Sequence, residues 1–96
     1  MPILPGMAAT SPGRDTTKRR AARRKREARG RRIARARAAC GLSIAKVAAR
    51  IDVDPKTLWR WEQGLVESRS DKLVALADTL AVSLRWIMTG AEENAA

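Results

Sequence analysis

Residues 55–63 combine two cationic side chains and an indole at spacings that suit one face of a short helix. Lys56 and Arg60 lie four residues apart, so they share a helical surface, with Trp59 beside them. Trp61 is two residues from Trp59 and therefore points away, toward the interior. Ammonium and guanidinium groups donate hydrogen bonds to guanine O6 and N7, and an indole packs against a base methyl or a sugar. This segment therefore predicts a surface that contacts the edges of bases.

Local signals define the helix that carries this surface. Asp54 is a favoured N-cap, and Pro55 suits the first helical position, where its missing N–H costs nothing. The helix is expected to run to about Gln63 and to end at Gly64.

A second short helix is expected directly before it. Ser43 is its predicted N-cap, apolar residues follow at helical spacing as far as Ile51, and Asp52 and Val53 form the turn. Two short helices joined by a tight turn, with cations on the outer face of the second, form a helix-turn-helix. That motif places its second helix in the major groove of DNA.

Three further helices complete the predicted fold, which is a compact all-α, five-helix domain. The first is expected to end at Gly41, the fourth to span roughly 69–81 with Ser68 or Ser70 as its cap, and the fifth to start at Ser83 and end at Gly90. The expected apolar positions are Ile33, Ala36 and a buried Cys40 in the first helix, Leu73, Leu76, Ala77 and Leu80 in the fourth, and Leu84, Ile87 and Met88 in the fifth.

Positive charge is concentrated at one end of the chain. Residues 1–37 hold thirteen Lys and Arg against two acidic residues, a net charge of +11, whereas residues 38–96 have a net charge of −1. This asymmetry favours a polyanionic partner, nucleic acid before membrane. We expect a basic arm over 1–30, a folded domain over 31–90 and a frayed tail over 91–96. Within the arm, residues 1–13 are expected to be disordered, and residues 14–30 to be a solvated coil or a fraying helix.

Composition argues against several other classes of protein. The chain has no histidine and one cysteine, which leaves almost no ligands for structural zinc, and no Ser, Cys or Lys constellation replaces the missing general base. We therefore expect no catalysis, no metal and no cofactor. A single cysteine suits a reducing cytoplasm, and no apolar run is long enough to span a membrane.

The segments LSIAKVAARIDVDPKTLWRWEQG (42–64) and LVALADTLAVSLRWIMTG (73–90) together resemble Cro/lambda-repressor-type helix-turn-helix regulators. These regulators include phage repressors, xenobiotic-response-element-like proteins, restriction controller proteins and some antitoxins. The resemblance covers residues 33–90, includes the W-E-x-G ending at Trp61, Glu62 and Gly64, and leaves the basic arm unexplained.

The resemblance assigns roles to particular residues. Base contacts are implied for Pro55, Lys56, Trp59 and Arg60, and phosphate contacts for Ser43, Ile44, Thr57, Gln63, Arg31 and Arg32. It also implies a structural pair between Arg37 and Glu62, and a dimer patch at Trp86, Ile87 and Met88. Two positions depart from the family pattern. Pro55 stands where many relatives have a polar side chain that reads a base, and Ile44 replaces the usual glutamine, leaving backbone amides to bind the phosphate.

These features predict a DNA-binding transcriptional regulator, most simply a repressor that binds a short palindromic operator in double-stranded DNA as a homodimer, in the cytoplasm at the nucleoid. An activator would use the same helix. Two alternatives stay open: an antitoxin that covers a toxin partner and regulates its own promoter, and a general nucleic-acid-binding protein dominated by the arm. A toxin or a polymerase is a possible protein partner.

Overall fold

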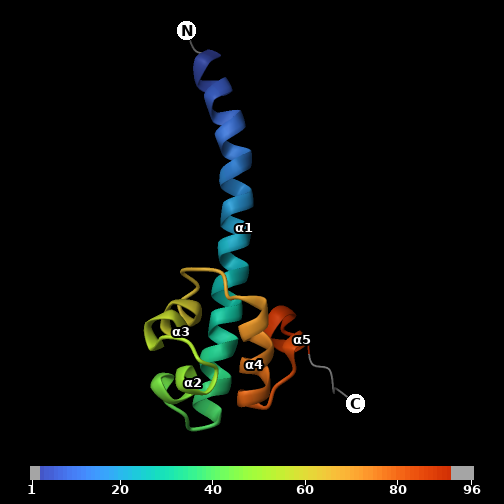
Figure 1. Ribbon diagram of the computed structural model, residues 1–96. Helices are drawn as coiled ribbons and strands as arrows, with labels where there is room; N and C mark the ends of the chain where they lie inside the picture. Colours follow the sequence, from blue (N-terminus) through green and yellow to red (C-terminus); the bar gives the residue numbers. More distant parts are fainter. Residues whose placement is uncertain (1–2, 92–96) are drawn as a thin grey trace.

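The computed structural model describes the backbone of residues 3–91 and the side chains of residues 16–91. These residues form five helices and no strand: α1 (Ile3–Ala39), α2 (Ile44–Arg50), α3 (Pro55–Glu62), α4 (Ser70–Leu80) and α5 (Leu84–Thr89). Figure 1 shows α1 as the axis of the molecule, with α2 and α3 on one side, α4 and α5 on the other, and the N-terminal part of α1 projecting beyond the bundle. The all-α, five-helix prediction is confirmed.

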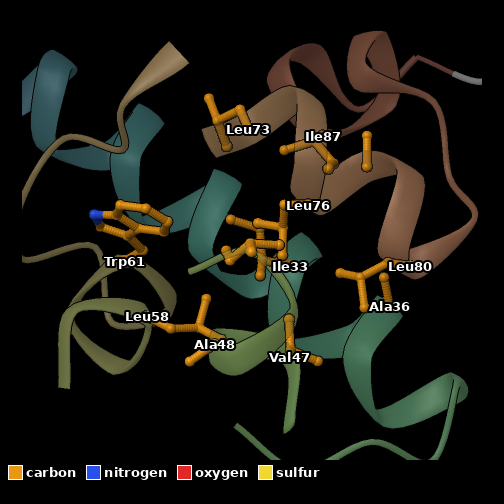
Figure 2. Packing of buried hydrophobic residues seen from close by; sticks show 12 residues of the cluster. Ile33, Ala36, Val47, Ala48, Leu58, Trp61, Leu73, Leu76, Leu80 and Ile87 are labelled. Atoms are coloured by element: carbon orange, nitrogen blue, oxygen red, sulfur yellow. The ribbon is translucent and has the colours of Figure 1, made fainter. Parts of the chain in front are cut away.

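The apolar core gathers around α1 (Figure 2). Ile33 of α1, Leu58 of α3 and Leu76 of α4 are fully buried, and Trp61 is 3% exposed. Burial of large apolar side chains is the main favourable term in folding, so this cluster is what joins the five elements. The remaining buried members of the cluster are Ala36, Val47, Ala48, Ile51, Leu73, Ala77, Leu80 and Ile87.

Three of the predicted N-caps are present. The Ser43 hydroxyl accepts a hydrogen bond from the Lys46 amide at 3.1 Å, and the Ser83 hydroxyl accepts one from the Trp86 amide at 2.9 Å. Asp54 caps α3 in the same way. Each side chain satisfies an amide that the first helical turn leaves unpaired.

The cap predicted for α4 is wrong. Arg69, rather than Ser68 or Ser70, occupies the N-cap position, with extended backbone and no side-chain cap hydrogen bond. Its guanidinium instead donates to Asp71 at 3.0 Å in the first turn of the helix. A carboxylate in that turn lies at the positive end of the helix dipole and stabilises the start of the helix.

The described part of the N-terminal arm is helical, which is one of the two states expected for residues 14–30. α1 is continuous from Ile3 through Gly30, with no boundary at residue 30, and its contacts with the rest of the domain already begin at Arg26. Gly30 lies inside this helix, at the position where α1 meets the end of α3 without room for a side chain. Residues 1–2 and 92–96, which include most of the predicted tail, lie outside the described residues.

Cys40 is exposed, contrary to the expected burial. It follows the last residue of α1, where the chain turns, and its S–H donates to the Leu80 carbonyl at 3.4 Å. Among the described helices, none is long and apolar enough to cross a membrane.

Candidate nucleic-acid interface

The turn between α2 and α3 is short and tightly bonded. Asp52 has a φ of +59°, a left-handed conformation that Asp tolerates better than most side chains. The Val53 amide donates to the Ala48 carbonyl at 3.0 Å, and the half-buried Val53 side chain packs against the core. The turn therefore sets the angle between the two helices through both a backbone bond and an apolar contact.

The first turn of α3 is preorganised by its two leading residues. Asp54 accepts a hydrogen bond from the Lys56 amide at 2.8 Å, and Pro55 occupies the first helical turn. Pro55 and Lys56 are both exposed, while Thr57 is half-buried. The helix therefore starts with its first side chains directed away from the core.

α3 has one buried face and one exposed face. Leu58 and Trp61 are buried in the core, as Figure 2 shows. On the other face, Trp59 is 44% exposed, and Lys56 and Arg60 are exposed and make no ion pair with any described residue. This outer face (Lys56, Trp59 and Arg60, with Pro55 at its start) is the surface that the sequence singles out, and its cations have their hydrogen-bond donors available.

Arg37 and Glu62 hold α3 against α1. The guanidinium donates from Nε to Glu62 Oε2 at 2.7 Å and from Nη2 to Oε1 at 3.0 Å, which makes the pair bidentate. A third hydrogen bond runs from Nη1 to the Leu42 carbonyl at 3.0 Å. The hydrogen bonds to Glu62 raise the pKa of Arg37, although burial acts in the opposite direction. The pair expected from the family resemblance is thus present in the structure.

A second set of contacts, which sequence reasoning missed, joins α1 to the end of α3. Arg26 Nε donates to the Gly64 carbonyl at 3.3 Å, and Arg29 pairs with Glu67. A Cβ on Gly30 would lie 2.4 Å from the Glu62 carbonyl oxygen, so only glycine fits there. The signal in the sequence was a glycine inside a run of helix-forming residues, which usually has a packing reason.

The residues expected at phosphates fall into two groups. Gln63, Arg31 and Ser43 are exposed, whereas the Ile44 side chain packs against the core. Ile44 therefore offers only its amide at the start of α2. Lys72, which the sequence analysis did not single out, donates to the Ile51 carbonyl at 2.9 Å and satisfies the other end of that helix.

Arg32 does not have the free side chain expected of a phosphate ligand. It donates from Nε to the Ile87 carbonyl at 2.8 Å and from Nη2 to the Met88 carbonyl at 3.2 Å. A guanidinium at the C-terminal end of α5 satisfies carbonyls that the helix leaves unpaired. Burial, with repulsion from Arg29 and Arg31, lowers the pKa of Arg32. In the structure, Arg32 therefore joins α1 to the end of α5.

The dimer patch expected at Trp86, Ile87 and Met88 requires a correction. Ile87 is fully buried in the core, and Trp86 is half-buried against it. Because Ile87 is the residue that packs inward, the exposed apolar side chains of α5 are Leu84 and Met88, at 38% and 40%. We call these two residues the exposed apolar pair of α5.

Comparisons with known proteins agree with this geometry. A family model described as helix-turn-helix matches residues 33–87, more than half of the chain. The fold is similar to the crystal structure of the clp gene regulator ClgR from C. glutamicum, with a TM-score of 0.63 and 28% identity, over 74% of this chain and 92% of that one. No curated protein matches the chain. The chain belongs to the Cro/C1-type helix-turn-helix family of DNA-binding transcriptional regulators.

Proposed function

We propose that this protein is a repressor that binds a short palindromic operator in double-stranded DNA, with α3 in the major groove. One observation carries the proposal. Lys56, Trp59 and Arg60 are exposed and free of ion pairs with described residues, on a helix whose opposite face is anchored in the core. A rigid helix with free donors on one face is what base reading requires.

The size of the described domain supports repression as the proposed direction of regulation. The described residues form one domain built around one core, so the simplest way for it to act is to occupy promoter DNA and exclude the transcription machinery. The similar protein ClgR is named as a gene regulator, which supports regulation as the role. The proposal places the protein at the nucleoid, in the cytoplasm.

A homodimer on DNA completes the proposal. Palindromic operators match two-fold symmetric dimers, with half-sites one helical turn apart. Leu84 and Met88 form an exposed apolar pair on α5, on the opposite side of α1 from α3 in Figure 1. We propose that this apolar pair contacts its copy in a second subunit, which would leave α3 of both subunits facing the DNA.

The test is selection of bound duplexes from a random DNA pool with the full chain. We expect a recurring palindrome, and we expect the double variant Lys56→Ala, Arg60→Ala to lose its preference for that palindrome. The matched control is Arg85→Ala, which removes an exposed cation from α5 and should recover the same palindrome as the unmodified protein.

Two results would contradict the proposal. Recovery of no motif would favour general nucleic-acid binding through the arm. Tight binding of a second small protein, with duplex binding that the double variant does not change, would favour the antitoxin alternative.

A further inference from the structure

The direction of α1 relative to α3 is fixed by close backbone contact. A Cβ on Gly30 would lie 2.5 Å from the Trp61 carbonyl oxygen, and a Cβ on Gly64 would lie 2.6 Å from the Cα of Glu27. The hydrogen bond from Arg26 to the Gly64 carbonyl closes the same contact. Because no side chain separates the two backbones here, α1 has little freedom to tilt, and its N-terminal extension leaves the domain along a defined line (Figure 1).

The face of α1 that meets α3 continues beyond the domain as a row of arginines. A helix advances about 100° per residue, so residues 4, 7 and 11 positions before Gly30 share its face. These residues are Arg26, Arg23 and Arg19. The Arg26 guanidinium donates to the Gly64 carbonyl. Arg19 and Arg23 lie past the last contact with the domain and are exposed. All three line one shallow hollow, to which the neighbouring Arg20 also contributes.

The charge of this segment has no counterpart within the described part of the chain. Residues 18–26 hold seven cations and no acidic residue. Among the described residues, its one ion pair joins Arg23 to Glu27 at 4.0 Å, with side-chain exposures of 63% and 42%. Exposed pairs at this spacing contribute little, so the segment keeps nearly its full charge. A straight helix carrying that charge suits a polyanion with regularly spaced phosphates.

We propose that Arg19 and Arg23 bind phosphates of the same duplex whose major groove accepts α3. This inference rests on the proposed function, since it places DNA on the α3 side of α1. Arg23 and Arg19 lie about 10 Å and 16 Å along α1 from Gly30, at a rise of about 1.5 Å per residue. A duplex that continues past the half-site carries a charge about every 1.7 Å of its axis, so phosphates are within reach of both side chains.

Such contacts add affinity without adding sequence information. Phosphates look alike at every base pair, so Arg19 and Arg23 should strengthen binding to the operator and to unrelated DNA by the same factor. They should also steepen the dependence of affinity on salt, because each neutralised phosphate releases counterions. In this arrangement α3 would supply sequence specificity. Arg19 and Arg23, held beside α3 by the rigid helix α1, would supply additional affinity.

The chain provides a matched pair of variants for the test. Arg19→Gln with Arg23→Gln removes two charges from the α3-side face. Lys18→Gln with Lys25→Gln removes two charges from exposed positions about 120–140° around the helix from Gly30. Glutamine has nearly the helix propensity of arginine and lysine, so both variants keep the helix. The affinity of the full chain for an operator duplex and for an unrelated duplex is then measured over a range of salt concentrations.

The slope of log affinity against log salt is negative, and we expect the α3-side variant to make it less steep by up to about 1.8 on both duplexes, because two lost contacts count about 0.9 each. The control variant should change the slope by less than half as much. Equal changes in the two variants, or no change in either, would overturn the proposal. So would an α3-side variant that weakens binding to single-stranded RNA but not to duplex DNA.

Failure of the proposed function is distinguishable from failure of this inference. If no operator is recovered, the two slopes on unrelated duplex DNA still decide whether Arg19 and Arg23 contact phosphates. If the operator is recovered and the slopes are unchanged, α3 reads DNA without help from the arginine row.

Discussion

Arg37 binds both carboxylate oxygens of Glu62 and thereby fixes the last turn of α3 to α1. The Glu62 side chain is 3% exposed and that of Arg37 is 20% exposed, so the acidic partner is the more deeply buried of the two. A buried carboxylate is tolerable only when it is paired and hydrogen-bonded. The position of α3 thus depends on one guanidinium from another element.

Replacing Arg37 with alanine should therefore destabilise the domain strongly. The substitution leaves Glu62 buried without its cation and also removes the bond to the Leu42 carbonyl. Loss of one partner of a buried pair costs about 3–5 kcal/mol, and we expect a value near the lower end because Arg37 is partly exposed. The measurement is a thermal or denaturant melt.

Arg35→Ala is the control for this prediction. Arg35 lies two residues earlier on α1, is exposed and makes no ion pair with a described residue, so its loss should change the free energy of unfolding by less than about 0.5 kcal/mol. Equal losses of stability in the two variants would show that the Arg37–Glu62 pair contributes nothing.

Gly30→Ala should lower stability even though it replaces glycine within a helix. At an exposed helical site this change gains about 1 kcal/mol. Here the added methyl would meet the backbone carbonyls of Trp61 and Glu62, and overpacking of that kind costs about 1–3 kcal/mol. Gly41→Ala is the comparison, because nothing lies within 4 Å of a Cβ there and only its φ of +68° opposes the change. A melt in which Gly30→Ala gains stability would mean that α1 and α3 separate easily.

Much of the fold follows from signals that act within one helical turn. Ser43, Asp54 and Ser83 cap helices because a short polar side chain reaches an amide two or three residues away, and the turn at Asp52 and Val53 is equally local. Periodicity alone also identified the buried stripe of α4. These interactions join residues close in the chain, so the sequence displays them directly.

The features that sequence reasoning missed depend on residues far apart in the chain. Arg26 and Gly64 are 38 positions apart, and Arg32 and Ile87 are 55 apart. Nothing in the local pattern says that Arg32 is needed at the end of α5 rather than at a phosphate. Helical spacing within α5 likewise allows either Ile87 or Met88 to face the core. The packing of α5 against α1 and α4 decides between them.

Trp59 and Trp61 should separate stability from DNA binding. Trp61→Ala removes a side chain that is 3% exposed and should cost about 3–5 kcal/mol of folding free energy. Trp59 is 44% exposed, so its replacement should cost far less stability while weakening operator binding about tenfold, or about 1.4 kcal/mol. Melts and titrations with operator duplex measure the two effects. If the Trp59→Ala variant binds the operator as tightly as the unmodified protein, the Trp59 indole does not contribute to DNA binding.

Met88→Glu should prevent pairing without unfolding the domain. A carboxylate at an apolar dimer contact is desolvated without a partner, whereas on the surface of a single copy it stays in water. We expect operator complexes of two subunits to become complexes of one, as measured by native mass spectrometry or sedimentation. Val74→Glu, on the exposed side of α4 at 51%, is the control and should leave the stoichiometry unchanged. If Val74→Glu changes the stoichiometry and Met88→Glu does not, the dimer contact lies on α4 instead of α5.

Truncation should locate the start of the folded domain at Arg26 rather than at residue 31. A chain that begins at residue 26 keeps the Arg26 bond to Gly64 and the Arg29 pair with Glu67, and its melting temperature should match that of the full chain. A chain that begins at residue 30 loses both contacts and should melt several degrees lower, since about 1 kcal/mol shifts the midpoint of a small domain by roughly 4–8 °C. Both truncations remove Arg19 and Arg23, so both should flatten the salt dependence of DNA binding equally. Equal melting temperatures would show that residues 26–29 add nothing to the domain, and the boundary would return to residue 31.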